Sequence, residues 1–170
     1  MSDLNEKHTV RVRGLFAALS LAALTLLVGC AAKPVKPLPL RAQFVVSADA
    51  NPDGAGRPSP IVVRLFQLSE EGAFASADFF ALYDKEKEVL GASVLAREEY
   101  VLTPGETRTI EIPLNPQARH LAVLAAFRDI RSARWRAVTR APEKTLTDLL
   151  GKDGVTIGIE KDVVTMTVKD

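Results

Sequence analysis

The chain has 170 residues, with 22 basic and 21 acidic side chains and a formal net charge of +1. This balance excludes binding to nucleic acid or to an anionic membrane through the overall electrostatic field, so specific contacts must carry any binding. A single cysteine, Cys30, excludes an internal disulfide and a thiolate zinc site.

The first 29 residues have the pattern of an export signal. Basic residues precede an apolar run over 15–28 that is too short to span a bilayer comfortably. The run ends in Leu27-Val28-Gly29-Cys30, which resembles the lipobox of bacterial lipoproteins. The resemblance implies cleavage before Cys30, a diacylglycerol on its sulfur and an N-acyl chain on its new amino group. The alternative is an ordinary secreted protein with a chance cysteine at the cut.

Removal of this leader would leave 141 residues, which suits one domain with one core. The leader holds three basic and two acidic residues, so 19 of each would remain. We expect residues 30–41 to form the acylated cysteine and a Pro-rich tether, because Pro34, Pro37 and Pro39 favour an extended spacer. Packing of this segment on the domain is the alternative. Ala31 favours the outer membrane, since aspartate after the cysteine favours inner-membrane retention in enterobacterial-type sorting.

Residues 42–170 are expected to form a mainly β domain. A turn-rich loop over 49–60 contains three prolines and two glycines. Ser76 is predicted to cap a short helix over 77–83, with Phe79, Leu82 and Tyr83 on one face. Short strands between turn signals indicate a β-sandwich with a small helical addition. We expect strands at residues 43–48, 61–68, 98–102, 108–114, 121–127, 134–138, 155–160 and 163–169.

The sequence offers little that could support catalysis. His120 is the one histidine after the leader, and alone it cannot assemble a usual zinc site. Glu98 and Glu99 would point to opposite faces of a strand, and Glu70-Glu71 is most simply a solvated loop. Gly54-Ala55-Gly56 lacks the Lys-Ser/Thr of a phosphate-binding loop. We therefore predict no enzyme activity, no catalytic or metal-binding residue and no cofactor.

An arginine-rich segment over 128–140 contains Trp135 and superficially resembles a nucleic-acid patch. An exported domain rarely meets nucleic acid, so we expect no such partner. The interpretation is instead that Trp135 faces the core. Arg134 and Arg136 would then point outward and pair with acidic residues such as Asp129.

Together, several segments resemble the TssJ (SciN or VasD-like) family of type VI secretion lipoproteins. They cover nearly the whole domain in order, which makes the similarity more specific than any single motif. His120 departs from the pattern, since relatives are expected to carry an aromatic residue there. Besides the lipobox, the matching residues are 51–53, 56–68, 77–83, 95–100, 104–106, 125–130 and 133–136.

The resemblance implies a transthyretin-like β-sandwich with a small helical addition, after a signal peptide and tether. It implies an outer-membrane lipoprotein whose domain faces the periplasm. The implied partners are the periplasmic region of the inner-membrane protein TssM (IcmF-like) and other subunits of the type VI membrane complex. The alternative is a periplasmic lipoprotein that binds a small ligand or glycan.

The family's contact element is the loop between the first two strands, which corresponds to Asp49–Ser59. Prolines in and beside this loop reduce its freedom, so less ordering entropy would be lost on docking. A purely structural loop is the alternative. The residues expected to bind the partner are Asn51, Pro52, Asp53, Gly54, Gly56 and Arg57.

Overall fold

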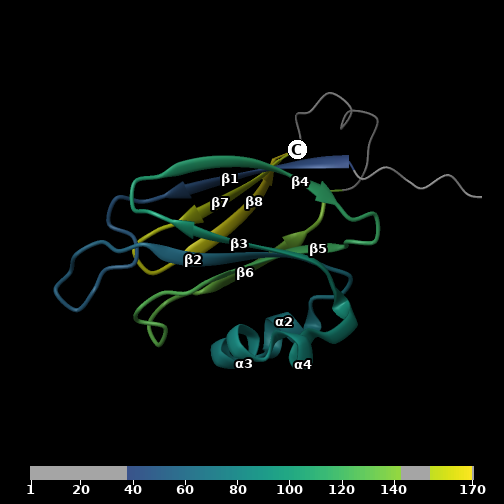
Figure 1. Ribbon diagram of the computed structural model, residues 1–170, viewed down its shortest axis with the longest axis horizontal. Coiled ribbons are helices and arrows are strands. Elements are labelled where there is room, and N and C mark those ends of the chain that lie inside the picture. The colour runs from purple at the N-terminus through teal and green to yellow at the C-terminus, as the bar shows by residue number, and fades with distance from the viewer. Residues whose placement is uncertain (1–37, 143–153, 170) are drawn as a thin grey trace, which may run out of the picture. The chain divides into compact units, whose positions relative to one another are not determined.

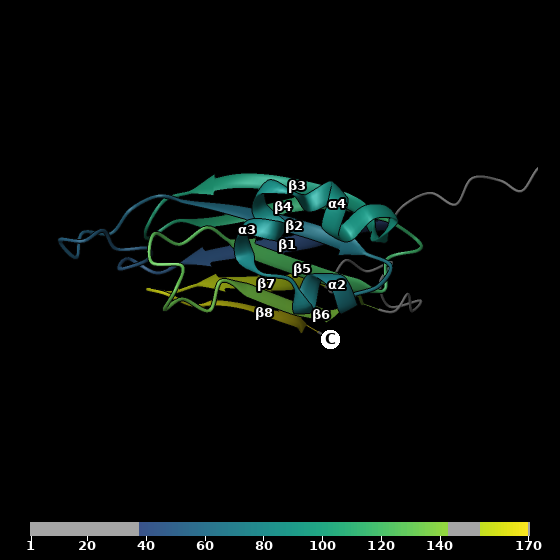
Figure 2. The same ribbon diagram turned by 90° about the horizontal axis from the view of Figure 1, so that it is seen from below.

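A computed structural model describes residues 38–142 and 154–169, and here eight strands form two stacked sheets of four strands each (Figures 1 and 2). The predicted signal peptide, Cys30 and residues 31–37 of the predicted tether lie outside this range. The predicted β-sandwich is confirmed. The strands are β1 (Leu38–Val46), β2 (Ile61–Leu68), β3 (Val94–Leu102), β4 (Thr107–Leu114), β5 (His120–Ala125), β6 (Arg136–Arg140), β7 (Gly154–Ile159) and β8 (Val164–Lys169).

The strand order is β4-β1-β7-β8 in one sheet and β3-β2-β5-β6 in the other. β1 pairs antiparallel with β4 and parallel with β7, so most of its length is bonded on both sides. The sandwich is closed at one side by the β3–β4 turn. At the other side an isolated bridge joins Arg134 to Val163.

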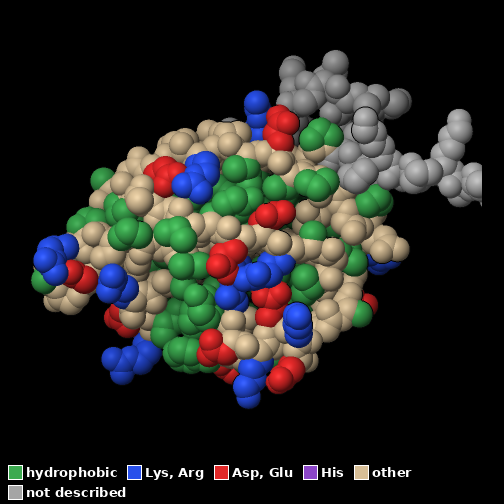
Figure 3. All heavy atoms as spheres, viewed as in Figure 1, with side chains coloured by type: hydrophobic (Ala, Val, Ile, Leu, Met, Phe, Trp, Pro, Cys, Tyr) green, Lys and Arg blue, Asp and Glu red, His purple; other side chains and the backbone are tan. Residues whose placement is uncertain are grey.

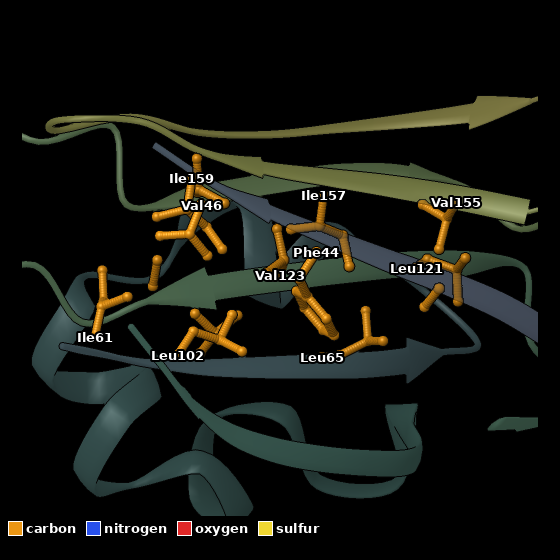
Figure 4. Close-up of a cluster of buried hydrophobic side chains, with 14 of the residues drawn as sticks. Phe44, Val46, Ile61, Leu65, Leu102, Leu121, Val123, Val155, Ile157 and Ile159 are labelled. Carbon is orange, nitrogen blue, oxygen red and sulfur yellow. The ribbon is translucent and has the colours of Figure 1, made fainter. Parts of the chain in front are cut away.

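The main core lies between the sheets, where Figure 4 shows apolar side chains from both layers pointing toward one another. Phe44 of β1 and Ile157 of β7 meet Leu65 of β2 and Val123 of β5 there. Along β1 the residues buried in this core are spaced by two, at Ala42, Phe44 and Val46, as expected for a strand with one buried face. Almost every residue of β5 is buried, because the other sheet covers one of its faces and short helices cover the other.

β1 begins five residues before the predicted start at Gln43. Residues 38–41, which were predicted to belong to the tether, therefore lie in the sheet. Leu40 is buried and pairs with Ile112 of β4. Pro39 is tolerated because its part of β1 pairs with β4 alone, where a missing N–H does not interrupt a second ladder.

Among the other strands, β2 has its predicted bounds, β4, β7 and β8 differ by one residue, and β5 ends two residues early at Ala125. The larger differences are at β3 and β6. β3 begins at Val94, four residues early, and β6 is shifted by two residues toward the C-terminus. In the described part of the chain no helix is long and apolar enough to cross a membrane.

The helical addition consists of α2 (Gly72–Ser76), α3 (Phe79–Asp84), α4 (Glu86–Leu90) and a 3-10 turn, η1 (Gly91–Ser93). The prediction that Ser76 caps the helix is wrong. Ser76 ends α2, and its hydroxyl donates to the Gly72 carbonyl at 2.9 Å. Asp78 caps α3 instead, because its extended backbone lets the carboxylate accept the Ala81 N–H at 2.9 Å.

Two arginines attach these helices to the outer face of β2 and β6. Arg136 donates to the Phe74 carbonyl at 3.1 Å and to the Ala77 carbonyl at 2.5 Å. Arg64 donates to the Tyr83 carbonyl at 2.7 Å and lies over the Tyr83 ring. These carbonyls belong to helix C-terminal ends, which have no partner within the helix. A positive charge at such an end is also favourable.

Arg136 thus points away from the main core, as predicted, but the prediction that it pairs with an acidic residue is wrong, because it binds helix carbonyls. Asp129 accepts instead from the Ser132 hydroxyl at 2.7 Å. Trp135 is half-buried, in agreement with its predicted place in the core. It packs against the main core and against a second apolar cluster, which lies between the short helices and the outer face of β2 and β5.

The sandwich has two ends with different loops. The entry end holds the start of β1 and the β4–β5 loop, since Leu38 pairs with Leu114. The distal end holds the loops over 47–60, 103–106, 126–135 and 160–163. At about 3.3 Å per residue, β1 separates the two ends by about 26 Å. Figure 1 shows β1 running from one end to the other.

Candidate partner-binding loop

The predicted contact loop leaves β1 at Val46 and extends from the distal end (Figure 1). Its tip is a turn closed on itself by backbone bonds. The Asp53 N–H donates to the Arg57 carbonyl at 2.9 Å, and the Gly56 N–H donates to the Asp53 carbonyl at 2.8 Å. Gly56 has φ +77, a conformation that glycine adopts without strain.

The Asp53 carboxylate holds this turn from inside. One oxygen accepts the N–H groups of Ala55 and Arg57 at 2.9 and 3.0 Å, and the other accepts Arg57 Nε at 2.8 Å. These bonds, led by the backbone N–H of Arg57, hold the pKa of Asp53 below its ordinary value. The turn is therefore ordered before any partner binds.

The exposed part of the tip is small and carries one long side chain. Arg57 is 79% exposed at its side chain, whereas its partner Asp53 is 20% exposed. Gly54, Ala55, Gly56 and Pro58 are exposed beside it. Figure 3 shows a basic and an acidic side chain together at this tip.

Asn51 is the one buried residue among the predicted contact residues, with 2% of its surface exposed. Its direct contact with a partner stays a prediction. Its amide nitrogen donates to the Pro60 carbonyl at 2.8 Å, and its side-chain oxygen accepts the Arg128 N–H at 2.8 Å. Its own N–H donates to the Lys161 carbonyl at 2.9 Å. Asn51 thus joins three loops of the distal end.

The residue type itself is a signal for this role, because asparagine is among the few residues other than glycine that adopt a positive φ readily. Asn51 has φ +50. The remaining predicted contact residues divide by exposure. Pro52 and Asp53 are half-buried and support the turn, while Gly54, Gly56 and Arg57 face outward. The predicted lipidation site, Cys30, lies outside the described residues.

The described residues contain no group of three histidine, cysteine or carboxylate side chains that could hold a metal ion. Glu98 and Glu99 lie next to each other on β3, and Arg64 binds Glu99 at 2.8 Å. This bond lowers the pKa of Glu99, which therefore stays ionised. His120 Nε2 lies 3.9 Å from a carboxylate oxygen of Glu71. Neither arrangement resembles an acid/base pair poised for catalysis.

Comparisons with known proteins give a consistent result. Residues 38–162 match the sequence model of a family described as "Type VI secretion lipoprotein, VasD, EvfM, TssJ". The crystal structure of the T6SS lipoprotein TssJ1 from Pseudomonas aeruginosa is 30% identical, with a TM-score of 0.71, and the match covers 79% of this chain and 98% of that one. The comparison with curated proteins found no match.

Two further solved structures are similar. Serratia marcescens Lip, described as a membrane bound component of the type VI secretion system, is 25% identical with a TM-score of 0.67, and the match covers 79% of this chain and 99% of that one. A chain of a structure described as a type VI membrane complex is 26% identical with a TM-score of 0.66, over 78% of this chain and 99% of that one.

Proposed function

The chain belongs to the family of type VI secretion lipoproteins that includes TssJ, and from this premise we propose that it anchors a secretion complex to the outer membrane. Acyl chains on Cys30 hold it in that membrane, and its domain faces the periplasm. The loop Asp49–Ser59 binds the periplasmic region of the TssM (IcmF-like) inner-membrane protein. The protein performs no chemistry and acts as a tether.

The observation that carries this proposal is the position of the loop relative to the point where the chain enters the domain. The tether joins β1 at the entry end, and the loop extends from the distal end, about 26 Å away along β1. Lipid attachment and partner binding would therefore occupy opposite ends. Neither task would obstruct the other.

The order of the loop supports partner binding as well. Because the Asp53 carboxylate already fixes the turn, docking would order few further groups and lose little conformational entropy. Arg57 is the one long, exposed side chain at the tip. Arginine is among the residues that most often dominate binding energy at interfaces.

The test is a binding titration between the mature chain carrying Cys30→Ser and the periplasmic region of the partner. Arg57→Gln removes the exposed charge, while the backbone bonds to Asp53 still hold the turn. We expect the dissociation constant to rise at least about tenfold, with the thermal midpoint nearly unchanged. Lys87→Gln on α4 is the matched control and should bind like the wild type. Equal affinity of Arg57→Gln and wild type would remove the loop from the proposal.

Lipid attachment has a separate test. Cys30→Ser should abolish acylation, as read by mass spectrometry of the membrane fraction. The same variant should lose flotation with membranes. Flotation of this variant at wild-type efficiency would contradict the lipid anchor.

Binding of a small ligand or glycan inside the sandwich gains no support. In the described part of the chain, the space between the sheets is filled by packed apolar side chains (Figure 4). A pocket of about 600 Å³ lies at the entry end of the sandwich, at the edge of this core, where Leu114 and Ala141 line it.

A further inference from the structure

β3 forms an open edge of its sheet, because it pairs with β2 alone. The opposite edge is closed beside β6, where the Val164 N–H of the other sheet donates to the Arg134 carbonyl at 2.9 Å. β4, the edge of the second sheet next to β3, carries Pro113, and proline is typical of an edge protected against pairing. Figure 2 shows β3 along one margin of the sandwich. Since β3 contains no proline, its edge can accept another strand.

The hydrogen bonds around Val101 show which backbone groups of β3 point away from β2. Val101 lies opposite Val62, but the Val62 carbonyl accepts the N–H of Ala126, directly after β5, at 2.8 Å. The Val101 carbonyl accepts instead from the Arg108 guanidinium at 3.3 Å. Val101 and Val62 therefore form a pair that exchanges no hydrogen bonds, and the backbone groups of Val101 point outward from the sheet.

Arg97 and Glu99 share this outward orientation, because the backbone groups of alternate residues point to the same side of a strand. The pairing of β2 with β3 is regular past both residues, and its register shifts only nearer the start of β3. Within residues 38–142 and 154–169, no loop or side chain bonds to their N–H or carbonyl groups. Two N–H and two carbonyl groups are therefore free at the centre of this edge.

These four groups match the same four groups of a second copy of the chain. When two β3 strands run antiparallel about a two-fold axis at Glu98, Arg97 lies opposite Glu99 of the second copy, and the two residues exchange both hydrogen bonds. The axis repeats this pair, so every free group finds a partner. The side chains of directly opposite residues lie about 5 Å apart, so opposite charges meet twice.

The side chains of β3 favour this register on both sides of the axis and oppose it at the centre. Arg97 is 34% exposed and Glu99 43%, so both can reach a second copy while they keep their present ion pairs with Glu86 and Arg64. Figure 3 shows such basic and acidic side chains together at the place of β3 in Figure 1. The two Glu98 side chains would meet on the axis, and like charges directly opposite are destabilising. The pairing is therefore specific in register and weak in solution.

We propose that the edge of β3 binds a second copy of this chain, through antiparallel pairing of the two β3 strands about Glu98. The two sheets then become one sheet of eight strands, with β3 of each copy at its centre. This inference rests neither on the lipid anchor nor on the contact loop of the proposed function.

Disulfide cross-linking of the mature chain tests the axis. Cys30→Ser removes the only cysteine, and Glu98→Cys then gives each copy one thiol on the axis, where the Cβ atoms of opposite residues lie close to the separation that a disulfide needs. We expect the disulfide-linked dimer to form at least about tenfold faster than in the matched control, because pairing raises the effective thiol concentration. The control is Glu111→Cys, which replaces an exposed glutamate of β4. Equal rates in the two proteins would overturn the proposal.

A mixture of two variants tests the register. Arg97→Cys and Glu99→Cys, each with Cys30→Ser, should cross-link to each other at least about tenfold faster than either does to itself, because each position lies opposite the other. Faster self-linking of either variant would show a different register and would also overturn the proposal. Glu98→Gln should lower the dissociation constant of the dimer about threefold in sedimentation equilibrium, since it removes the like charge on the axis.

A proline at position 97 separates a second copy from other strands that could occupy the edge. Arg97→Pro removes an N–H that β2 does not use, so the domain should fold, and cross-linking of the Glu98→Cys protein should fall to the rate of the control. Binding of the periplasmic region of the TssM-like protein should be unchanged by this proline. If the proline weakens that binding and Glu98→Cys cross-links no faster than the control, the edge receives a strand of that protein, and the assignment to a second copy is overturned. The cysteine variants give their result even if the proline variant does not fold.

Discussion

Replacement of Asn51 by alanine should loosen the whole distal end. Its side chain makes two hydrogen bonds, to the Pro60 carbonyl and from the Arg128 N–H, each at 2.8 Å. Alanine would leave both backbone groups without these partners, at about 1 kcal/mol each. Alanine at φ +50 adds about 1 kcal/mol, since only glycine and asparagine adopt this region readily. The expected loss in the free energy of unfolding is about 3 kcal/mol.

Thermal unfolding followed by circular dichroism measures this loss. For a domain of this size, about 3 kcal/mol corresponds to a fall in the midpoint of roughly 12 °C. Asn51→Gly should lose about 2 kcal/mol, because glycine accepts the positive φ but restores neither bond. The order of the two variants therefore separates backbone strain from hydrogen bonding.

Asn115→Ala is the matched control. The Asn115 side chain accepts one bond, from the Gln117 N–H at 2.9 Å, and has an ordinary backbone conformation. Its removal should lower the stability by about 1 kcal/mol. The reasoning is refuted if Asn51→Ala melts within about 2 °C of the wild type, or if it is no less stable than the Asn115 variant.

Three further predictions concern the helical addition and the loop. Arg136→Met should lower the free energy of unfolding by about 2 kcal/mol, because the Phe74 and Ala77 carbonyls lose a charged donor. Urea unfolding measures this loss, and equal stability would show that this arginine does not hold α2. Gly56→Ala should lower stability by about 1 kcal/mol, since alanine is strained at φ +77, and an unchanged melting midpoint would contradict this. The pKa of Asp53 is lowered in the folded state, so its stabilisation of the turn is complete above about pH 4 and is lost as the pH falls through the lower pKa. The Arg57 amide signal in NMR should follow that transition, and a signal constant down to pH 2 would argue against it.

The sheet architecture could be predicted from the sequence because its strands are short β-branched or alternating apolar runs between turn residues. β2 was placed with its observed bounds, since Ile61–Leu68 is β-branched and apolar with turn residues before it. The start of β1 could not be placed in the same way. Pro39 signals a spacer, and only the pairing of Leu40 with Ile112 shows that the chain has already entered the sheet.

The contact loop was located by resemblance, but the sequence did not show which of its residues face outward and which support the turn. Asn51 and Asp53 are polar and lie in a turn-rich segment, which normally indicates exposure. The Asn51 side chain instead binds a backbone group 77 positions away, and the Asp53 side chain binds backbone groups of its own turn. The same limit explains Arg136, whose carbonyl partners belong to a helix that begins more than 60 residues earlier. Long-range hydrogen bonds of this kind leave no local pattern.

The double pairing of β1 has a mechanical consequence for a tether. Tension between a lipid before β1 and a protein held by the loop after Val46 would pass along the backbone of β1, because the loop continues directly from this strand. A β-strand is already extended, so β1 would transmit the pull with little lengthening. The hydrogen bonds to β4 and β7 run across that direction and hold the strand straight in the sheet.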